Sequence, residues 1–211
     1  MQVKGADGPG KEVVGGTEVA REDLPPYLAS LGRYSSEGDR HGCGASLIAE
    51  STVLTAAHCA GLFDYIDFGR YDLSGGLEGV DRRELCRAES AEDCDGLSYT
   101  VVHPGYIPYW ETNDLALIFL NEPVSGNTTP IMLNDDEKLP SSLDPLAVYG
   151  WGATRPGGSV STLPQTTEVF YFPNKNCAGG EPFAYDRSWI SDDMLCAWDY
   201  GSDSCQGDSG E

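Results

Sequence analysis

The sequence predicts an all-β fold. Short runs of β-branched, aromatic and aliphatic residues alternate along the chain with clusters of Gly, Pro, Asn, Asp and Ser, as strands alternate with turns. The 211 residues include 26 glycines and 13 prolines, which suits a protein rich in loops, and long amphipathic helical periodicity is absent. At ~150 residues per domain, the chain has the length of one large domain or two small ones.

The first half of the chain contains a predicted hairpin and one deeply buried strand. Residues 46–48 and 52–56 are apolar runs on either side of a polar Ala49-Glu50-Ser51 break, as expected of two strands around a turn. Residues 115–120 (LALIFL) are apolar at both alternations, which predicts a strand that is buried on both faces. Between these elements, the loop-rich residues 74–95 leave the register of the neighbouring strands open.

The second half of the chain adds two further strands. Residues 146–149 are followed by Gly150-Trp151-Gly152, which indicates a strand that runs into a tight turn. Residues 168–172 form another apolar run, and Pro173 stops it because proline cannot donate to a sheet ladder.

Charge and hydropathy exclude two classes of partner. The chain carries 13 Lys and Arg against 34 Asp and Glu, a net charge of -21, so it has no positive field to hold a nucleic acid backbone. No apolar run approaches the ~18 residues needed to span a bilayer, so no membrane partner is expected. The acidic clusters at residues 89–95, 135–137 and 192–193 are typical of solvated faces.

Seven cysteines indicate disulfide bonds and therefore an oxidising, extracellular location. None of them has the C-x-x-C spacing of a zinc site or a redox motif. The odd count leaves at least one thiol without a partner in this chain. Residues 1–12 are polar and Gly-rich, with no apolar core resembling a secretory signal.

Three segments far apart in the sequence carry the parts of a nucleophilic hydrolase. A histidine, His58, ends one predicted strand, and a carboxylate, Asp114, stands at the start of the most buried strand. A hydroxyl, Ser209, lies between glycines in Gly207-Asp208-Ser209-Gly210, where the backbone can turn sharply.

These residue types fit one mechanism. A serine hydroxyl needs a base to take its proton, and an imidazole suits that task near neutral pH, so His58 is the expected base for Ser209. A buried carboxylate, Asp114, would hold the imidazole in one tautomer. The backbone N–H groups of Gly207 and Ser209 lie close enough in sequence to converge on an oxyanion.

Further motifs occur in a fixed order around these segments: Val13-Val14-Gly15-Gly16, Gly42-Cys43-Gly44-Ala45-Ser46, His103-Pro104-Gly105-Tyr106 and Gly150-Trp151-Gly152. Together they resemble the trypsin-like serine proteases of the chymotrypsin fold, peptidase family S1. The resemblance implies two antiparallel six-stranded β-barrels, with His58 and Asp114 in the first and Ser209 in the second. It also implies a propeptide-like segment at residues 1–12 and a protease domain at residues 13–211.

The resemblance also implies substrate specificity and activation. The base of the family's specificity pocket falls six residues before the nucleophile, on Asp203, which implies cleavage of proteins or peptides after Arg or Lys. Activation of a zymogen would pair the α-amine of Val13 with Asp208, although cleavage after Lys11 would leave Glu12 attached. Protease inhibitors are expected partners, and a monomer is the expected state.

Disulfides follow from the same resemblance, which pairs Cys43 with Cys59 and Cys177 with Cys196. Cys86 and Cys94 have no counterpart, but they are close in sequence and are expected to pair with each other. Cys205 then remains, because its family partner follows the nucleophile, whereas this chain stops at Glu211. The expectation is an incomplete second barrel and an inactive chain.

No cofactor is implied, and no metal is expected, because Arg70 stands where the family's calcium loop needs a carboxylate.

Non-catalytic interpretations stay open for each of these residues taken singly. His58 alone fits a core histidine, Asp114 a turn residue and Asp203 a solvated loop charge. His41 and His103 are expected to be structural or exposed. Asn127-Thr128-Thr129 fits an acceptor for N-linked glycans, a triplet that also arises by chance.

Two competing functions belong to other classes. One is a non-catalytic protease-like binding module, which the presence of all three catalytic residue types disfavours, or an inactive truncated homologue. The other is an esterase of the α/β-hydrolase fold. It is excluded because the segment around Ser209 lacks the final glycine of G-x-S-x-G, and because the order His, Asp, Ser differs from that fold's order.

Overall fold

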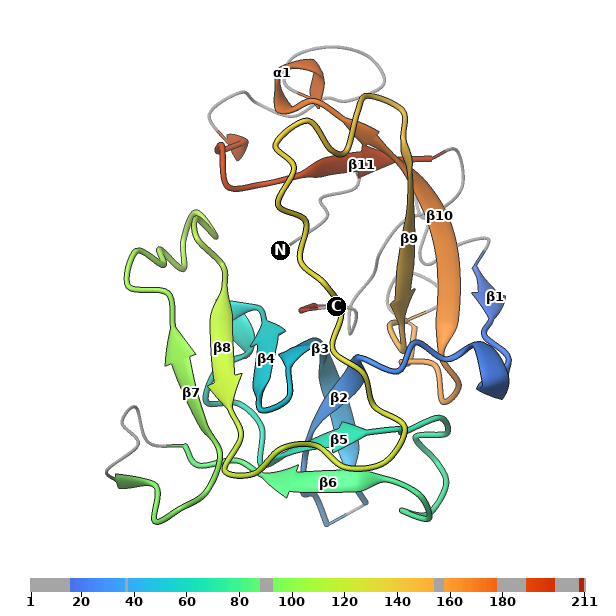
Figure 1. The fold of residues 1–211 in the computed structure, drawn as a ribbon, viewed down its shortest axis with the longest axis vertical. Coiled ribbons are helices and arrows are strands. Elements are labelled where there is room, and N and C mark those ends of the chain that lie inside the picture. Colours follow the sequence, from blue (N-terminus) through green and yellow to red (C-terminus); the bar gives the residue numbers. More distant parts are fainter. Residues whose placement is uncertain are drawn as a thin grey trace.

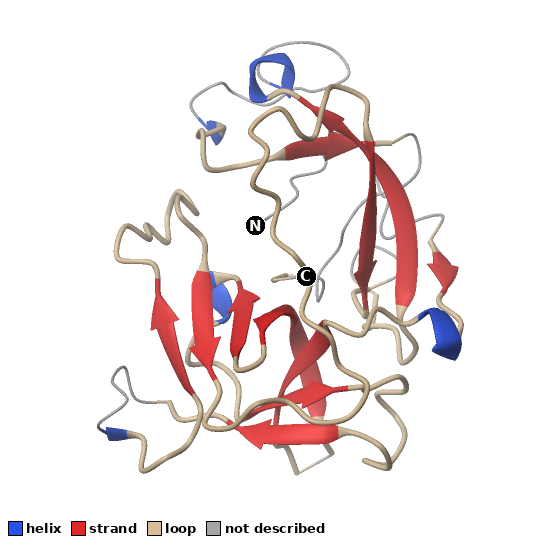
Figure 2. Ribbon diagram, in the orientation of Figure 1, coloured by secondary structure: helices blue, strands red, loops and turns tan. Residues whose placement is uncertain are grey.

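Two antiparallel β sheets make up the computed structural model, which describes residues 16–36, 38–87, 93–153, 158–177, 189–199 and 209–210 (Figure 1). The predicted all-β class is confirmed. Helical elements among the described residues are short (Figure 2) and include the 3-10 helices η1 (Arg21–Asp23) and η2 (Ala57–Cys59) and the α-helix α1 (Asn174–Cys177). No helix of the described residues is long and apolar enough to cross a membrane.

The first sheet contains seven strands in the order β6-β5-β2-β3-β4-β8-β7. Their bounds are β2 (Leu28–Arg33), β3 (Arg40–Ala49), β4 (Thr52–Thr55), β5 (Tyr65–Phe68), β6 (Asp81–Glu84), β7 (Tyr99–Val102) and β8 (Ala116–Phe119). Its two outer strands come together where Leu85 bridges Ser98, and the Cys86 N–H donates to the Ser98 carbonyl at 2.7 Å. The sheet therefore wraps around its own core.

The predicted hairpin is formed by β3 and β4, in which Leu47 pairs with Val53. The predicted buried strand is β8, which lies between β4 and β7. Only one of its faces is fully buried: Ala116 and Ile118 point into the core, whereas Leu117 and Phe119 are half-buried. The other face is covered in part by a neighbouring strand, where the Phe119 ring stacks on Tyr99 with 5.3 Å between ring centroids.

The core of the first half lies inside this curved sheet. It consists of apolar side chains from five strands together with the disulfide Cys43–Cys59, and its largest fully buried side chains are Leu31, Leu47, Val53, Ile66, Phe68 and Ile118. Fully burying a side chain of this size stabilises a fold by about 1.5–3 kcal/mol. This core provides a rigid support for the ends of β4 and β8.

The second sheet is centred on β10 (Gln165–Phe172). That strand pairs along its length with β9 (Pro145–Gly150), and with β1 (Thr17–Glu18) and β11 (Cys196–Trp198) at its two ends. β9 and β10 contain the two strands predicted for this half of the chain. Trp151, directly after β9, is fully buried and donates its indole N–H to the Tyr71 carbonyl at 3.2 Å, which ties the two sheets together.

Three disulfides are present among the described residues: Cys43–Cys59, Cys86–Cys94 and Cys177–Cys196. These are the pairs expected from the family resemblance and, for Cys86 and Cys94, from their closeness in sequence. Cys205 lies outside the described residues. Cys43–Cys59 joins β3 to η2 and so holds the turn that carries His58.

A buried ion pair supports the edge of the first sheet. Asp67 on β5 is buried, and both of its oxygens accept hydrogen bonds from Arg82 on β6, at 2.7 and 2.8 Å. The Arg82 guanidinium lies 3.5 Å from the centroid of the Tyr65 ring. Breaking this pair leaves the buried Asp67 carboxylate with only Arg70, 3.5 Å away, as a counter-charge, which is more costly than losing an exposed ion pair.

The Arg82→Met substitution is therefore expected to lower the free energy of unfolding by about 3 kcal/mol, the low end of the range for a broken buried pair, because Arg70 remains beside Asp67. Urea unfolding followed by tryptophan fluorescence measures the change. Arg87→Met is the matched control, because Arg87 pairs with Asp64 at the surface, and its loss should cost less than about 1 kcal/mol. Equal losses for the two variants would mean that the Asp67–Arg82 pair adds no more than a surface pair.

Candidate active site

His58 and Asp114 are brought together by two paired strands. β4 leads into η2, which carries His58, and β8 starts two residues after Asp114. β4 and β8 are antiparallel neighbours in which Thr55 pairs with Ala116, so the end of one strand lies beside the start of the other. The carboxylate and the imidazole therefore meet at one edge of the rigid first sheet.

Both oxygens of Asp114 bind His58. One oxygen, Oδ2, lies 2.7 Å from the imidazole Nδ1, and the other, Oδ1, accepts the backbone N–H of His58 at 2.9 Å. Because a carboxylate can only accept in this pair, Nδ1 carries the hydrogen, and Nε2 is the ring nitrogen that can take up a proton. Two bonds to one residue fix both the tautomer and the orientation of the ring.

The carboxylate is buried and the imidazole is accessible. The side chain of Asp114 is 5% exposed and that of His58 is 29% exposed. Burial on its own raises the pKa of Asp114, but the hydrogen bonds from the ring and the backbone of His58 outweigh it, and the pKa is lowered from its ordinary value of 3.8. Asp114 is consequently ionised at neutral pH and can stabilise a positive charge on the ring.

The lowered pKa of Asp114 makes stability depend on pH. The folded state holds this carboxylate more strongly in its charged form, so the contribution is present above the unfolded pKa of about 3.8 and is lost as the pH falls through the folded pKa. Urea unfolding between about pH 6 and pH 2 should show that the wild type loses more stability on acidification than Asp114→Asn. Parallel curves for the two proteins would contradict this linkage.

The turn before Asp114 adopts an unusual backbone that is held from several sides. Asn113 has a φ of 52°, in the left-handed region, which asparagine tolerates better than most residues. Its side-chain amide donates to the Gly105 carbonyl at 3.0 Å, and its backbone N–H donates to the carboxylate of Asp193. The Leu115 N–H donates back to the Asn113 carbonyl at 2.7 Å, which closes a tight turn around Asp114.

Asp193 was not identified from the sequence as part of this site. Its cluster, Asp192-Asp193, is typical of a solvated face, and the structure instead uses Asp193 to hold the backbone next to Asp114. The segment that carries it leads into β11 of the second sheet, so the contact joins the two halves of the chain at the site. No local sequence signal distinguishes Asp193 from its neighbour, because the partner lies 80 residues away.

Ser209 lies against the same edge of the first sheet. Its carbonyl accepts the Gly44 N–H at 2.8 Å, and the Thr55 hydroxyl donates to the Gly44 carbonyl at 2.8 Å. Gly210 has a φ of +88°, and a Cβ at this position would clash with Thr55 and with the Gly44 carbonyl. Only glycine fits there, and this close approach brings Ser209 to the end of β4, which leads into η2.

The other predicted site residues lie outside the described residues. This holds for Gly207 and Asp208 beside the nucleophile, for Asp203 and for Val13. His41 accords with a structural role: its Nδ1 lies 2.7 Å from the hydroxyl of the buried Ser30.

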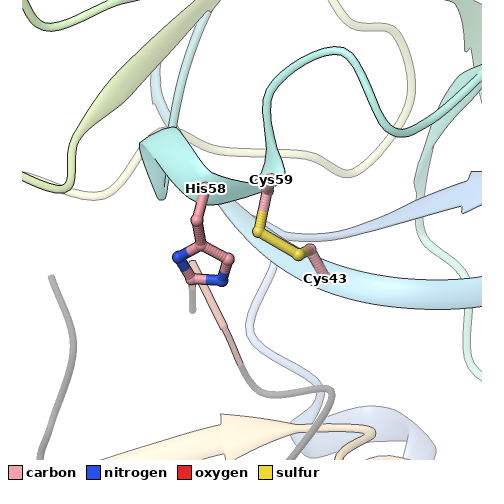
Figure 3. A group of neighbouring side chains, drawn as sticks. All are labelled: Cys43, His58 and Cys59. Carbon is pink, nitrogen blue, oxygen red and sulfur yellow. A yellow bond between two sulfur atoms is a disulfide. The ribbon is translucent and has the colours of Figure 1, made fainter. Parts of the chain in front are cut away.

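The surroundings of His58 do not suit a metal ion. Ligand atoms of Cys43, His58 and Cys59 lie within 4.8 Å of one another, but the two sulfurs are joined in a disulfide and cannot act as thiolate ligands (Figure 3). The loop at Arg70 does not suit calcium either. The buried Arg70 guanidinium donates to the carbonyls of Leu73 and Gly75, at 3.0 and 3.1 Å, so a positive charge already occupies the place of a cation.

The chain is similar to known proteins along nearly its whole length. The family model described as Trypsin matches residues 13–211. Serine proteinase stubble of Drosophila melanogaster is 33% identical over 96% of this chain, which spans 25% of that protein. Trypsin epsilon of Drosophila erecta and chymotrypsin-like elastase family member 1 of Homo sapiens are each 32% identical over 94% of this chain, which spans 71% and 73% of their lengths.

A solved structure has the same fold. The human heparin binding protein superposes with a TM-score of 0.73 over 93% of this chain and 78% of that protein, at 24% sequence identity. At this identity the likeness concerns the arrangement of the two sheets alone.

Proposed function

The chain belongs to the trypsin family of serine endopeptidases, and from this premise we propose that the protein to which it belongs cleaves peptide bonds after Arg or Lys through a Ser-His-Asp acyl-enzyme mechanism. The observation that carries the proposal is the double hydrogen bond from His58 to the buried carboxylate of Asp114. This arrangement prepares an imidazole to accept a proton, and the Ser209 backbone, whose carbonyl accepts the Gly44 N–H, lies against the same sheet, which supports Ser209 as the nucleophile.

In the proposed reaction, Ser209 Oγ attacks the scissile carbonyl carbon while His58 Nε2 takes the hydroxyl proton. The backbone N–H groups of Gly207 and Ser209 bind the oxyanion of the tetrahedral intermediate. Collapse of this intermediate breaks the C–N bond, and His58 returns the proton to the leaving amine. Water then repeats the same steps on the acyl-enzyme and releases the acid.

Asp114 supports this cycle electrostatically. When His58 holds the serine proton, its ring is positively charged and lies 2.7 Å from a carboxylate that is 5% exposed. A charge pair in a partly dehydrated site is screened less than a pair in water, so the imidazolium is stabilised when it forms. Because Asp114 is fixed by two bonds, little reorganisation accompanies this change.

Specificity for Arg or Lys rests on Asp203, six residues before Ser209. A carboxylate at the base of a narrow pocket is costly unless a cation pairs with it, so a substrate Arg or Lys gains affinity there. The relatives include both trypsins and elastases, which makes this residue the feature that favours basic substrates.

A pair of matched peptide substrates, with Arg or Ala before the scissile bond, tests this specificity. The wild type should prefer Arg, and Asp203→Ser should lower kcat/KM for the Arg substrate by about 10⁴-fold and change the Ala substrate little. Asp192→Ser is the control, since it removes an exposed acidic charge at another position. A wild type that prefers the Ala substrate would contradict the Arg or Lys specificity while leaving the serine mechanism intact.

Activation and location form part of the same proposal. The Trypsin family match begins at Val13, the residue whose α-amine would pair with Asp208 after removal of residues 1–12. Three disulfides favour an oxidising, extracellular environment. The active form would be a monomer that acts on protein substrates and is blocked by protease inhibitors.

A further inference from the structure

An open groove of about 640 Å³ lies away from the candidate active site. Four segments line it: residues 21–26 around η1, residues 68–71 at the end of β5, Gly79 and Asp81 at the start of β6, and the turn at residues 125–128. The lining residues include neither His58 nor Asp114. The groove is therefore a concave feature apart from the residues that the proposed proteolysis uses.

Asn127 belongs to the lining of this groove and is exposed. It starts Asn127-Thr128-Thr129, which is the only N-x-S/T triplet in the sequence. Such a triplet is an acceptor for N-linked glycans where it lies on the surface of an exported protein, and Thr129 is exposed as well. Surface position and sequence motif thus coincide at the rim of the groove.

The turn that carries Asn127 is firmly held. Ser125 donates its backbone N–H and its hydroxyl to one oxygen of Asp81 on β6, at 2.9 and 2.8 Å. Thr128 donates its hydroxyl to the Ser125 carbonyl at 3.1 Å, and Gly126 supplies the left-handed conformation, with a φ of +83°. A fixed turn keeps Asn127 beside the groove.

We propose that Asn127 carries an N-linked oligosaccharide whose first sugars lie in this groove. The donor is a lipid-pyrophosphate-linked oligosaccharide. A bond forms between Nδ2 of Asn127 and the anomeric carbon, the bond from that carbon to the pyrophosphate oxygen breaks, and the lipid pyrophosphate leaves with the electron pair. The amide loses one proton in exchange for the sugar.

The chemistry of the groove suits a carbohydrate. The exposed Pro26 presents apolar surface for the C–H face of a sugar ring. The Arg21 guanidinium covers one face of the half-buried Tyr71 ring, 4.4 Å from its centroid, so Tyr71 offers only its remaining surface, while Arg21 and Glu22 provide charged groups for the sugar hydroxyls. Each contact is weak, but the covalent link at Asn127 gives the sugars a high effective concentration next to these residues. Weak contacts are then sufficient to keep the groove covered.

The inference rests on the proposed export of the chain and is independent of its proteolytic activity. The full chain is therefore translated behind a cleavable signal sequence in the presence of endoplasmic reticulum microsomes, and chains protected from added protease are scored. One glycan should be present as a mobility shift that peptide N-glycosidase removes. Asn127→Gln and Thr129→Ala should lose this shift, whereas Thr129→Ser and the control Asn134→Gln should keep it. Protected wild-type chains without a shift would overturn the proposal.

The position of the sugars is tested by hydroxyl-radical footprinting of the folded, glycosylated protein before and after enzymatic removal of the glycan. Oxidation of Tyr71 should rise when the glycan is removed. Oxidation of Tyr109, which is 84% exposed and does not line the groove, should not change. A glycan that leaves Tyr71 equally reactive would place the sugars in solvent and overturn the occupation of the groove.

Discussion

Replacing Ser209 with alanine is expected to lower kcat for peptide hydrolysis by roughly 10⁶-fold. The substitution removes the only atom that can form the acyl bond in the proposed mechanism, and neither His58 nor Asp114 can replace it. The effect should fall on kcat, because alanine leaves the substrate cleft nearly unchanged in shape. Hydrolysis of the Arg peptide, followed to long times at high enzyme concentration, measures the residual rate.

The folded state of this variant is checked separately. Ser209 contacts the first sheet through its backbone carbonyl, which accepts the Gly44 N–H, and this bond does not involve the hydroxyl. The urea midpoint of Ser209→Ala should therefore match that of the wild type. Ser159→Ala, at an exposed serine, serves as the control for activity. An organophosphonate should label the wild type and not Ser209→Ala; labelling or hydrolysis by the variant would remove Ser209 from the mechanism.

Local patterns in the sequence predict the strands that bury apolar residues. The β3–β4 hairpin and β8 are recognisable because hydrophobic residues flank a polar turn or form a continuous run. β6, with the sequence DRRE, carries no such signal. It is a strand because Arg82 neutralises the buried Asp67 on β5 and covers the Tyr65 ring, and these are contacts between separate elements. Such pairing cannot be inferred before the topology is known.

For the candidate site as well, the sequence predicts some features and not others. The identities of His58 and Asp114 follow from residue types and their order, since the chemistry needs an imidazole and a carboxylate. The geometry of the two residues cannot be predicted in this way, because it depends on β4 lying next to β8. The role of Asp193 is further removed from the sequence: it binds the Asn113 backbone, and a backbone N–H leaves no trace in the pattern of side chains.

Replacing Asp114 with asparagine is expected to lower kcat by about 10⁴-fold with little change in KM. The amide has nearly the shape of the carboxylate, so the backbone N–H of His58 can still donate to its oxygen. Its NH₂ group, however, is a donor, and next to Nδ1 it favours the tautomer in which Nε2 carries the hydrogen. An imidazole in that state cannot take the proton of Ser209, and the negative charge that would stabilise the imidazolium is also lost.

Two comparisons separate this effect from a general loss of charge or structure. Asp192→Asn removes an exposed carboxylate close in sequence to the Asp193 contact and should leave kcat unchanged. Asp193→Asn alters a contact to the Asn113 backbone rather than a bond to His58, so its loss in kcat should be smaller than that of Asp114→Asn. Measured on the Arg peptide at neutral pH, an Asp114→Asn enzyme with full kcat would show that His58 needs no carboxylate to act as the base. The double hydrogen bond between the two residues would then serve only to hold the turn.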